Sequence, residues 1–137
     1  MKRIVLALAA ILPGMLLFAQ LVNDPNAESR EAKNFHSIKV SHAFDVYLTQ
    51  GDDESVVVSA GEEKFVSQVK TEVKDGELHV WHDGGNIHNW NTKKMKLKVY
   101  ISFKDLDKLD LSNDCHVYSV GDWKDEELKK KLLGTTK

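Results

Sequence analysis

From residue 35 onward, apolar and polar residues alternate along most of the chain. This period of two predicts β-strands that bury one face and expose the other. The alternation is clearest between residues 94 and 101, where lysines and one tyrosine separate four apolar residues: Met95, Leu97, Val99 and Ile101. Further short strands are predicted over 37–40, 44–49, 56–58, 69–73, 78–80, 106–111 and 117–120, so the chain is expected to be all-β.

Turn residues separate the predicted strands. Asp75-Gly76 is a hairpin signal, because the tightest hairpin turn needs positive φ angles at its centre. Residues 82–92 form a long polar segment rich in glycine, asparagine and histidine, which predicts a loop. Residues 124–133 carry acidic before basic side chains and predict a short helix in the tail.

Residues 1–19 show the three-part pattern of a secretory signal peptide. A basic start is followed by an apolar run from Ile4 to Phe18, and the small residue Ala19 precedes the expected cut. The run is shorter than the ~20 residues that a membrane-spanning helix needs. We therefore expect a helical signal peptide that is removed, with an uncleaved anchor as the alternative. The mature protein is expected to be exported, in the periplasm or at the cell surface, with no stable membrane span.

Composition narrows the class of partner. The chain has 137 residues and a formal net charge of −2. Loss of Lys2 and Arg3 with the signal peptide leaves 17 basic against 21 acidic side chains. The mildly acidic charge of the domain argues against binding to nucleic acid, which requires a basic surface.

Cys115 is the only cysteine, so no internal disulfide can form. It is expected to be a partly buried small residue, or else to join two chains or act as a reactive thiol.

Three histidines and an aspartate lie within residues 79–88 and suggest a metal site. His79 and His82 would point to opposite faces of a strand, so their spacing does not preform such a site. A site built from His82, Asp83 and His88 would require the loop to fold back on itself. Solvated histidines are the simpler interpretation, and no cofactor is expected.

Two tryptophans flank the same loop, which suggests carbohydrate binding. Trp81 and Trp90 could stack on a sugar ring while the amides of Asn86 and Asn89 bind its hydroxyl groups. The alternative is that one or both indoles cap the core with their N–H groups bonded to loop carbonyls.

No pattern typical of an enzyme stands out in the sequence. Cys115 and His116 are neighbours that would point apart on a strand, and no Gly-x-Ser-x-Gly or glycine-rich phosphate loop is present. A non-enzymatic protein is therefore expected.

Several segments together resemble the head GIN domain family, also called the auto-transporter adhesin domain or domain of unknown function 2807. The resemblance rests on these segments: Phe35-His36-Ser37-Ile38-Lys39-Val40, Phe44-Asp45-Val46-Tyr47-Leu48-Thr49-Gln50-Gly51, Val69-Lys70-Thr71-Glu72-Val73-Lys74-Asp75-Gly76-Glu77-Leu78, Val99-Tyr100-Ile101 and Leu109-Asp110-Leu111-Ser112. It implies short strands stacked as a β-helix-like solenoid and no known catalytic residues or cofactor. It also implies a binding, adhesin-like or structural role in the bacterial cell envelope.

The resemblance sets the expected domain organisation. Residues 1–19 are the signal peptide, 20–33 a flexible leader, 34–123 the head GIN-like domain, and 124–137 a tail or the start of a further rung. Members of the family usually continue with more rungs and have a glycine where Asn113-Asp114 stands here. We therefore expect a short or truncated member, and one alternative is a remnant without a function of its own. The expected partners are an envelope protein, a glycan, or a second copy joined through exposed strand edges or Cys115.

Overall fold

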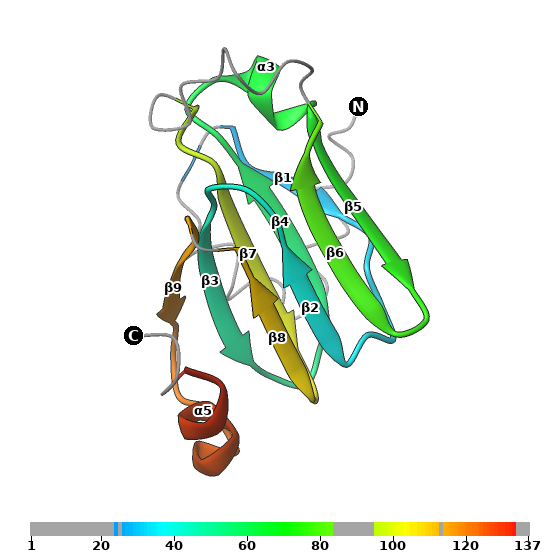
Figure 1. Cartoon of the computed structure of the whole chain (residues 1–137), viewed down its shortest axis with the longest axis vertical. Coiled ribbons are helices and arrows are strands. Elements are labelled where there is room, and N and C mark those ends of the chain that lie inside the picture. Colours follow the sequence, from blue (N-terminus) through cyan, green and yellow to red (C-terminus); the bar gives the residue numbers. More distant parts are fainter. Residues whose placement is uncertain (1–23, 25, 84–94, 113, 134–137) are drawn as a thin grey trace.

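The computed structural model describes residues 24, 26–83, 95–112 and 114–133. Two β-sheets pack face to face in the described part, and two short helices lie at opposite ends of them (Figure 1). The elements in chain order are β1 (Glu28–Arg30), β2 (Ser37–Val40), β3 (Asp45–Gln50), β4 (Ser55–Ser59), α3 (Glu63–Val66), β5 (Val69–Lys74), β6 (Glu77–His82), β7 (Lys98–Phe103), β8 (Lys108–Leu111), β9 (His116–Ser119) and α5 (Glu126–Leu133). The expectation of a mostly β protein is therefore confirmed.

The first sheet, sheet A, has the strand order β1-β4-β7-β3-β9, and the second, sheet B, has the order β5-β6-β2-β8. Three strands of sheet B are each followed along the chain by a strand of sheet A: β6 by β7, β2 by β3, and β8 by β9. Within each sheet these strands are parallel and keep the same order. We call the three successive pairs β6/β7, β2/β3 and β8/β9 strand pairs, with β2/β3 in the middle.

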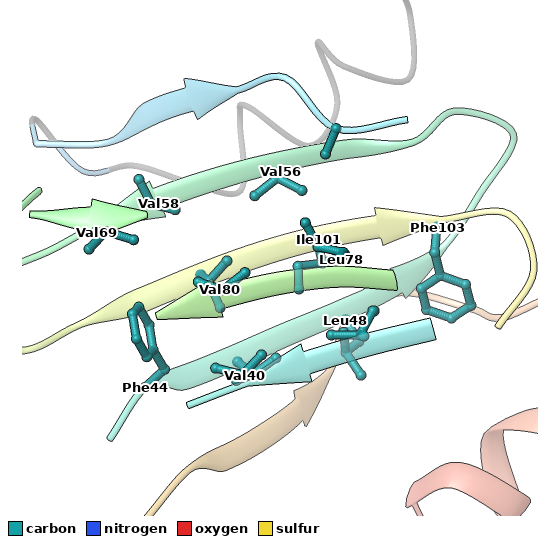
Figure 2. Packing of buried hydrophobic residues seen from close by; sticks show 14 of the residues in the cluster. Val40, Phe44, Leu48, Val56, Val58, Val69, Leu78, Val80, Ile101 and Phe103 are labelled. Atoms are coloured by element: carbon teal, nitrogen blue, oxygen red, sulfur yellow. The ribbon is translucent and has the colours of Figure 1, made fainter. Parts of the chain in front are cut away.

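The core consists of apolar rows that cross the strand pairs in register. Ile38 lies between Leu78 and Leu109 in sheet B, and Val46 lies between Val99 and Val117 in sheet A. Figure 2 shows how the side chains of the two sheets fill the space between them. The alternation in the sequence is thus the alternation between this interior and the two outer faces.

The hairpin between β5 and β6 turns at the predicted Asp-Gly pair. Asp75 has a φ of 53° and Gly76 a φ of 81°. A Cβ atom at Gly76 would lie 2.3 Å from His36 Nε2. The position therefore needs glycine both for its backbone angle and for the close approach of His36.

The sandwich is closed at the side where β1 and β5 lie. The Arg30 guanidinium donates to the carbonyl oxygens of Val66 at 2.9 Å and Val69 at 2.7 Å. Ala32, two residues after β1, is buried in the core. Part of the predicted flexible leader is therefore wrong, because residues 28–30 form a strand and Ala32 packs in the core.

The C-terminal segment packs across one end of the strands of sheet A. Trp123 is buried with its ring edge-on to Phe103, at 5.1 Å between ring centres. The Asp125 N–H donates to Gln50 Oε1 at 2.9 Å, and Lys124 pairs with Asp52. The helix α5 agrees with the predicted helical tail (Figure 1).

The strand predicted between 94 and 101 begins later than its alternation suggests. Lys96 has a φ of 48°, a left-handed backbone conformation that interrupts an extended chain, and β7 starts at Lys98. Met95 and Leu97 are nevertheless buried in the core.

Among the described residues, no helix is long and apolar enough to cross a membrane. The predicted signal peptide lies outside the described residues.

Candidate functional site

Three tyrosines form a stacked row on the outer face of sheet A. Tyr47 on β3 stacks on Tyr100 of β7 at 4.7 Å and on Tyr118 of β9 at 5.0 Å between ring centres. The parallel register places the three rings directly beside one another. We call these residues the tyrosine row.

The row exists because each tyrosine follows a core valine. Val46, Val99 and Val117 point inward, so the next residue of each strand points outward. The Val-Tyr dipeptide occurs at 46–47, 99–100 and 117–118, and this repeat is a signal in the sequence that the interpretation above missed.

Two tyrosines of the row, Tyr47 and Tyr100, have raised pKa values. Burial, and next the charge of Asp45, raise the pKa of Tyr47 above that of an ordinary tyrosine. Burial also raises the pKa of Tyr100, with Tyr47 as the second cause. Tyr118 at the end of the row is 45% exposed. The row therefore offers one accessible aromatic ring with its hydroxyl group, that of Tyr118.

Polar side chains flank the tyrosine row on both sides. Lys98, Asp45 and His116 share one cross-strand row, and His116 Nδ1 lies 3.8 Å from the Asp45 carboxylate. Ser102 and Thr49 lie in register on the other side. The outer face of sheet A thus combines an aromatic stripe, of the kind enriched at binding surfaces, with charged and hydroxyl groups beside it.

Trp81 lies on the outer face of sheet B. Its ring stacks on His79 at 4.5 Å between ring centres, and His79 Nε2 lies 3.1 Å from Ser41 Oγ. Burial, and next the charge of Lys39, lower the pKa of His79. A depression of about 390 Å³ on the same face is lined by Ser37, Glu72, Lys74, Asp75, Glu77, His79 and Lys108. Trp81 is half-buried on this face and does not cap the core.

Two residues of the suggested metal site, His82 and Asp83, lie in different surroundings. His82 is the last residue of β6 and is buried, with Nε2 at 2.7 Å from Gln68 Oε1. Burial, and next the charge of His42, lower the pKa of His82. Asp83 is exposed, and its N–H donates to the Gln68 carbonyl oxygen at 2.8 Å. The interpretation of His82 as a solvated loop histidine is therefore wrong.

The other candidate residues of the loop lie outside the described residues. These are Asn86, His88, Asn89 and Trp90. Within the described part of the chain, no three His, Cys, Asp or Glu side chains converge closely enough to hold a metal ion.

Cys115 is half-buried at the corner between β8 and β9. Its Sγ donates to the His42 carbonyl oxygen at 2.9 Å. The prediction of a partly buried small residue is confirmed at this position.

Residues 34–136 match the family described as "Putative auto-transporter adhesin, head GIN domain". The chain belongs to this family. The resemblance seen in the sequence motifs is thereby confirmed. No curated protein matches the sequence.

Solved structures share the fold of this head GIN domain. A "putative adhesin" from Bacteroides fragilis is 20% identical with a TM-score of 0.55, and the match covers 68% of this chain and 41% of that one. A "putative adhesin" from Parabacteroides merdae is 18% identical with a TM-score of 0.56, over 68% of this chain and 38% of that one. A "putative lipid binding protein" from Parabacteroides distasonis is 19% identical with a TM-score of 0.52, over 65% and 38%.

The head GIN domain described here spans about two fifths of the length of these structures. At such identities the likeness shows a common fold. The family description and the adhesin neighbours group the chain with adhesin-like proteins.

Proposed function

We propose that the chain is an exported, non-catalytic adhesion module of the bacterial cell envelope. Family membership supports the adhesin class, and the pattern of residues 1–19 supports export to the periplasm or the cell surface. The observation that carries the proposal is the tyrosine row, which places three stacked rings on an outer sheet face among polar groups.

The three strand pairs act as rungs of a short β-solenoid in this proposal. Their parallel register in both sheets, and the same order β6-β2-β8 and β7-β3-β9, support it. A solenoid repeats its outward positions at the strand spacing, so one Val-Tyr dipeptide in each rung yields a straight aromatic row. Such a row suits an extended ligand that runs across the strands.

Adhesion through the tyrosine row requires a ligand that offers hydroxyl or amide groups and apolar faces. Tyrosine combines a large apolar surface with a hydroxyl group and loses little conformational entropy when it binds. Tyr118 has the greatest exposure of the three rings and is the first contact for such a ligand.

The test measures retention of the exported protein on immobilised mucin, collagen and bacterial polysaccharides. Tyr118→Ser is expected to weaken retention about tenfold on the surface that binds, the loss of one good aromatic contact. Lys130→Ser is the matched control, because Lys130 is exposed on α5, outside the tyrosine row and the polar groups beside it. Equal retention of both variants would refute a role for the row. No retention of the wild type on any surface would support the alternative of a remnant without its own function.

A second candidate is carbohydrate binding through the face of sheet B. The observation that favours it is the Trp81–His79 stack on the sheet face that carries the charged depression. Trp81→Ala is expected to abolish binding to a polysaccharide if this face binds it. Lys70→Ala, directly opposite Trp81 on β5, is the control. Loss of binding in Tyr118→Ser but not in Trp81→Ala would exclude the second candidate.

A further inference from the structure

We propose that the side of the sandwich formed by β8 and β9 is a dimerisation surface. A second copy of the chain covers it by pairing its own edge strands against these two. We call this side of the molecule the β8/β9 edge.

Incomplete burial of the third strand pair is the first observation. Two apolar rows of the core are fully buried at the middle pair and half-buried at the β8/β9 edge. Ile38 is 0% exposed whereas Leu109, its neighbour in register, is half-buried. In the same way Val46 is 0% exposed and Val117 is half-buried. The interior therefore reaches the surface on this side, which a further layer of strands would cover.

Unpaired backbone groups at the same edge are the second observation. The His116 N–H donates to the carbonyl oxygen of Phe44, directly before β3, at 3.0 Å, and the Val120 N–H donates to that of Leu48 in β3 at 2.8 Å. Successive residues of a strand point their backbone groups to opposite sides. The N–H and C=O groups of Ser119 therefore point away from β3, to a side where no described strand lies.

The same alternation applies to β8. The Ser112 N–H donates to the Val40 carbonyl oxygen at 3.0 Å, so the backbone groups of Leu111 and Leu109 point away from β2. Both sheets thus present an open edge on the same side, which is a template for strand pairing.

The opposite side of the sandwich is built differently. There Arg30 joins the two sheets by its hydrogen bonds to Val66 and Val69. The strand β1 has only three residues, and β5 carries exposed charged side chains at Lys70 and Lys74. Short and charged edge strands discourage pairing. The described contacts of the C-terminal segment with Gln50 and Asp52 lie at the ends of strands.

Charge complementarity favours a second copy of the chain as the partner that covers the β8/β9 edge. Lys108 and Asp110 flank Leu109 on the exposed face of β8. When two copies of β8 pair antiparallel about Leu109, Lys108 faces the partner's Asp110, and the same pair forms again by symmetry. Leu109 then meets its own copy on the inner face. The edge is therefore self-complementary in charge and in apolar surface.

The test begins with sedimentation equilibrium of the exported protein. A reversible dimer is expected, and Lys108→Asp is expected to weaken it about tenfold, because two attractive cross-strand pairs become repulsive. The Asp110→Lys variant is expected to behave likewise. An equal mixture of the two variants is expected to recover wild-type affinity as a heterodimer, because both of its charge pairs are then opposite in sign.

Backbone variants check the pairing independently of charge. Ser119→Pro removes only an outward N–H group and is expected to abolish the dimer while the monomer stays folded. Thr71→Pro is the control. The Thr71 backbone N–H points away from β6 in the middle of β5, on the opposite side of the sandwich, so this variant is expected to leave the dimer intact. A wild-type monomer at all concentrations would overturn the proposal. So would a dimer that neither the charge variants nor Ser119→Pro weakens.

Discussion

The rows of the core allow two identical substitutions to be compared in different surroundings. Val46 and Val117 are neighbours in register, so Val46→Ala and Val117→Ala remove the same two methyl groups. Val46 is 0% exposed between two strand pairs, whereas Val117 is half-buried at the β8/β9 edge. Any difference in cost between the two variants therefore reports how far each position is covered.

The expected costs follow from the burial of each position. Two buried methyl groups contribute about 1.6 kcal/mol of transfer free energy. The cavity left at Val46 adds up to about 1 kcal/mol, which brings the cost of Val46→Ala to about 2–3 kcal/mol. At Val117 most of the transfer term still applies, but solvent fills the gap and no cavity is left, so we expect a cost of about 1.2 kcal/mol in the monomer.

Urea unfolding followed by circular dichroism measures both costs. The experiment is run at protein concentrations below and above the dimer dissociation constant. Above it, the cost of Val117→Ala is expected to rise toward that of Val46→Ala, because the second copy covers the position. Equal costs in the monomer would refute the reasoning, since they would mean that the third strand pair is already fully covered.

Three further predictions concern other contacts. Arg30→Ala is expected to lower the free energy of unfolding by about 2–3 kcal/mol, because two charged hydrogen bonds are lost. Glu28→Ala, which removes the exposed partner of the ion pair with Arg30, is expected to lower it by less than about 0.5 kcal/mol. Urea unfolding of the two variants compares these costs. Trp123→Ala is expected to cost about 3–5 kcal/mol and to release α5, seen as lost helical circular dichroism. Burial lowers the pKa of His82, so the unfolded chain takes up this proton near pH 6.5 and the folded chain only at lower pH. Stability is therefore full above about pH 6.5 and falls as the pH drops below it, and His82→Gln is expected to flatten that fall.

The alternation of apolar and polar residues predicted most strands because burial on one face dictates it. The interior positions of β2 and β3, such as Ile38, Val40 and Leu48, are those the pattern indicates. The Asp-Gly turn was predicted because its backbone angles restrict the residue types. These features are local, so the sequence alone carries them.

Features that depend on distant contacts were missed or misjudged. Residues 28–30 look like a polar leader, but β1 pairs with β4 and Arg30 reaches carbonyl groups almost forty residues away. His82 is polar and sits beside a loop, yet Gln68 gives it a partner in a buried position. The tyrosine row arises only when three strands align, so a repeated Val-Tyr dipeptide in the sequence does not by itself reveal a surface.

Residue-resolved amide hydrogen exchange of the exported protein tests the open β8/β9 edge most directly. In dilute solution, the N–H of Val120, which donates to Leu48, is expected to be protected, whereas that of Ser119 exchanges rapidly. At high protein concentration, the Ser119 N–H is expected to gain protection as a second copy pairs with β9. Protection of Ser119 that is already high in dilute solution, or that never rises with concentration, would contradict the account.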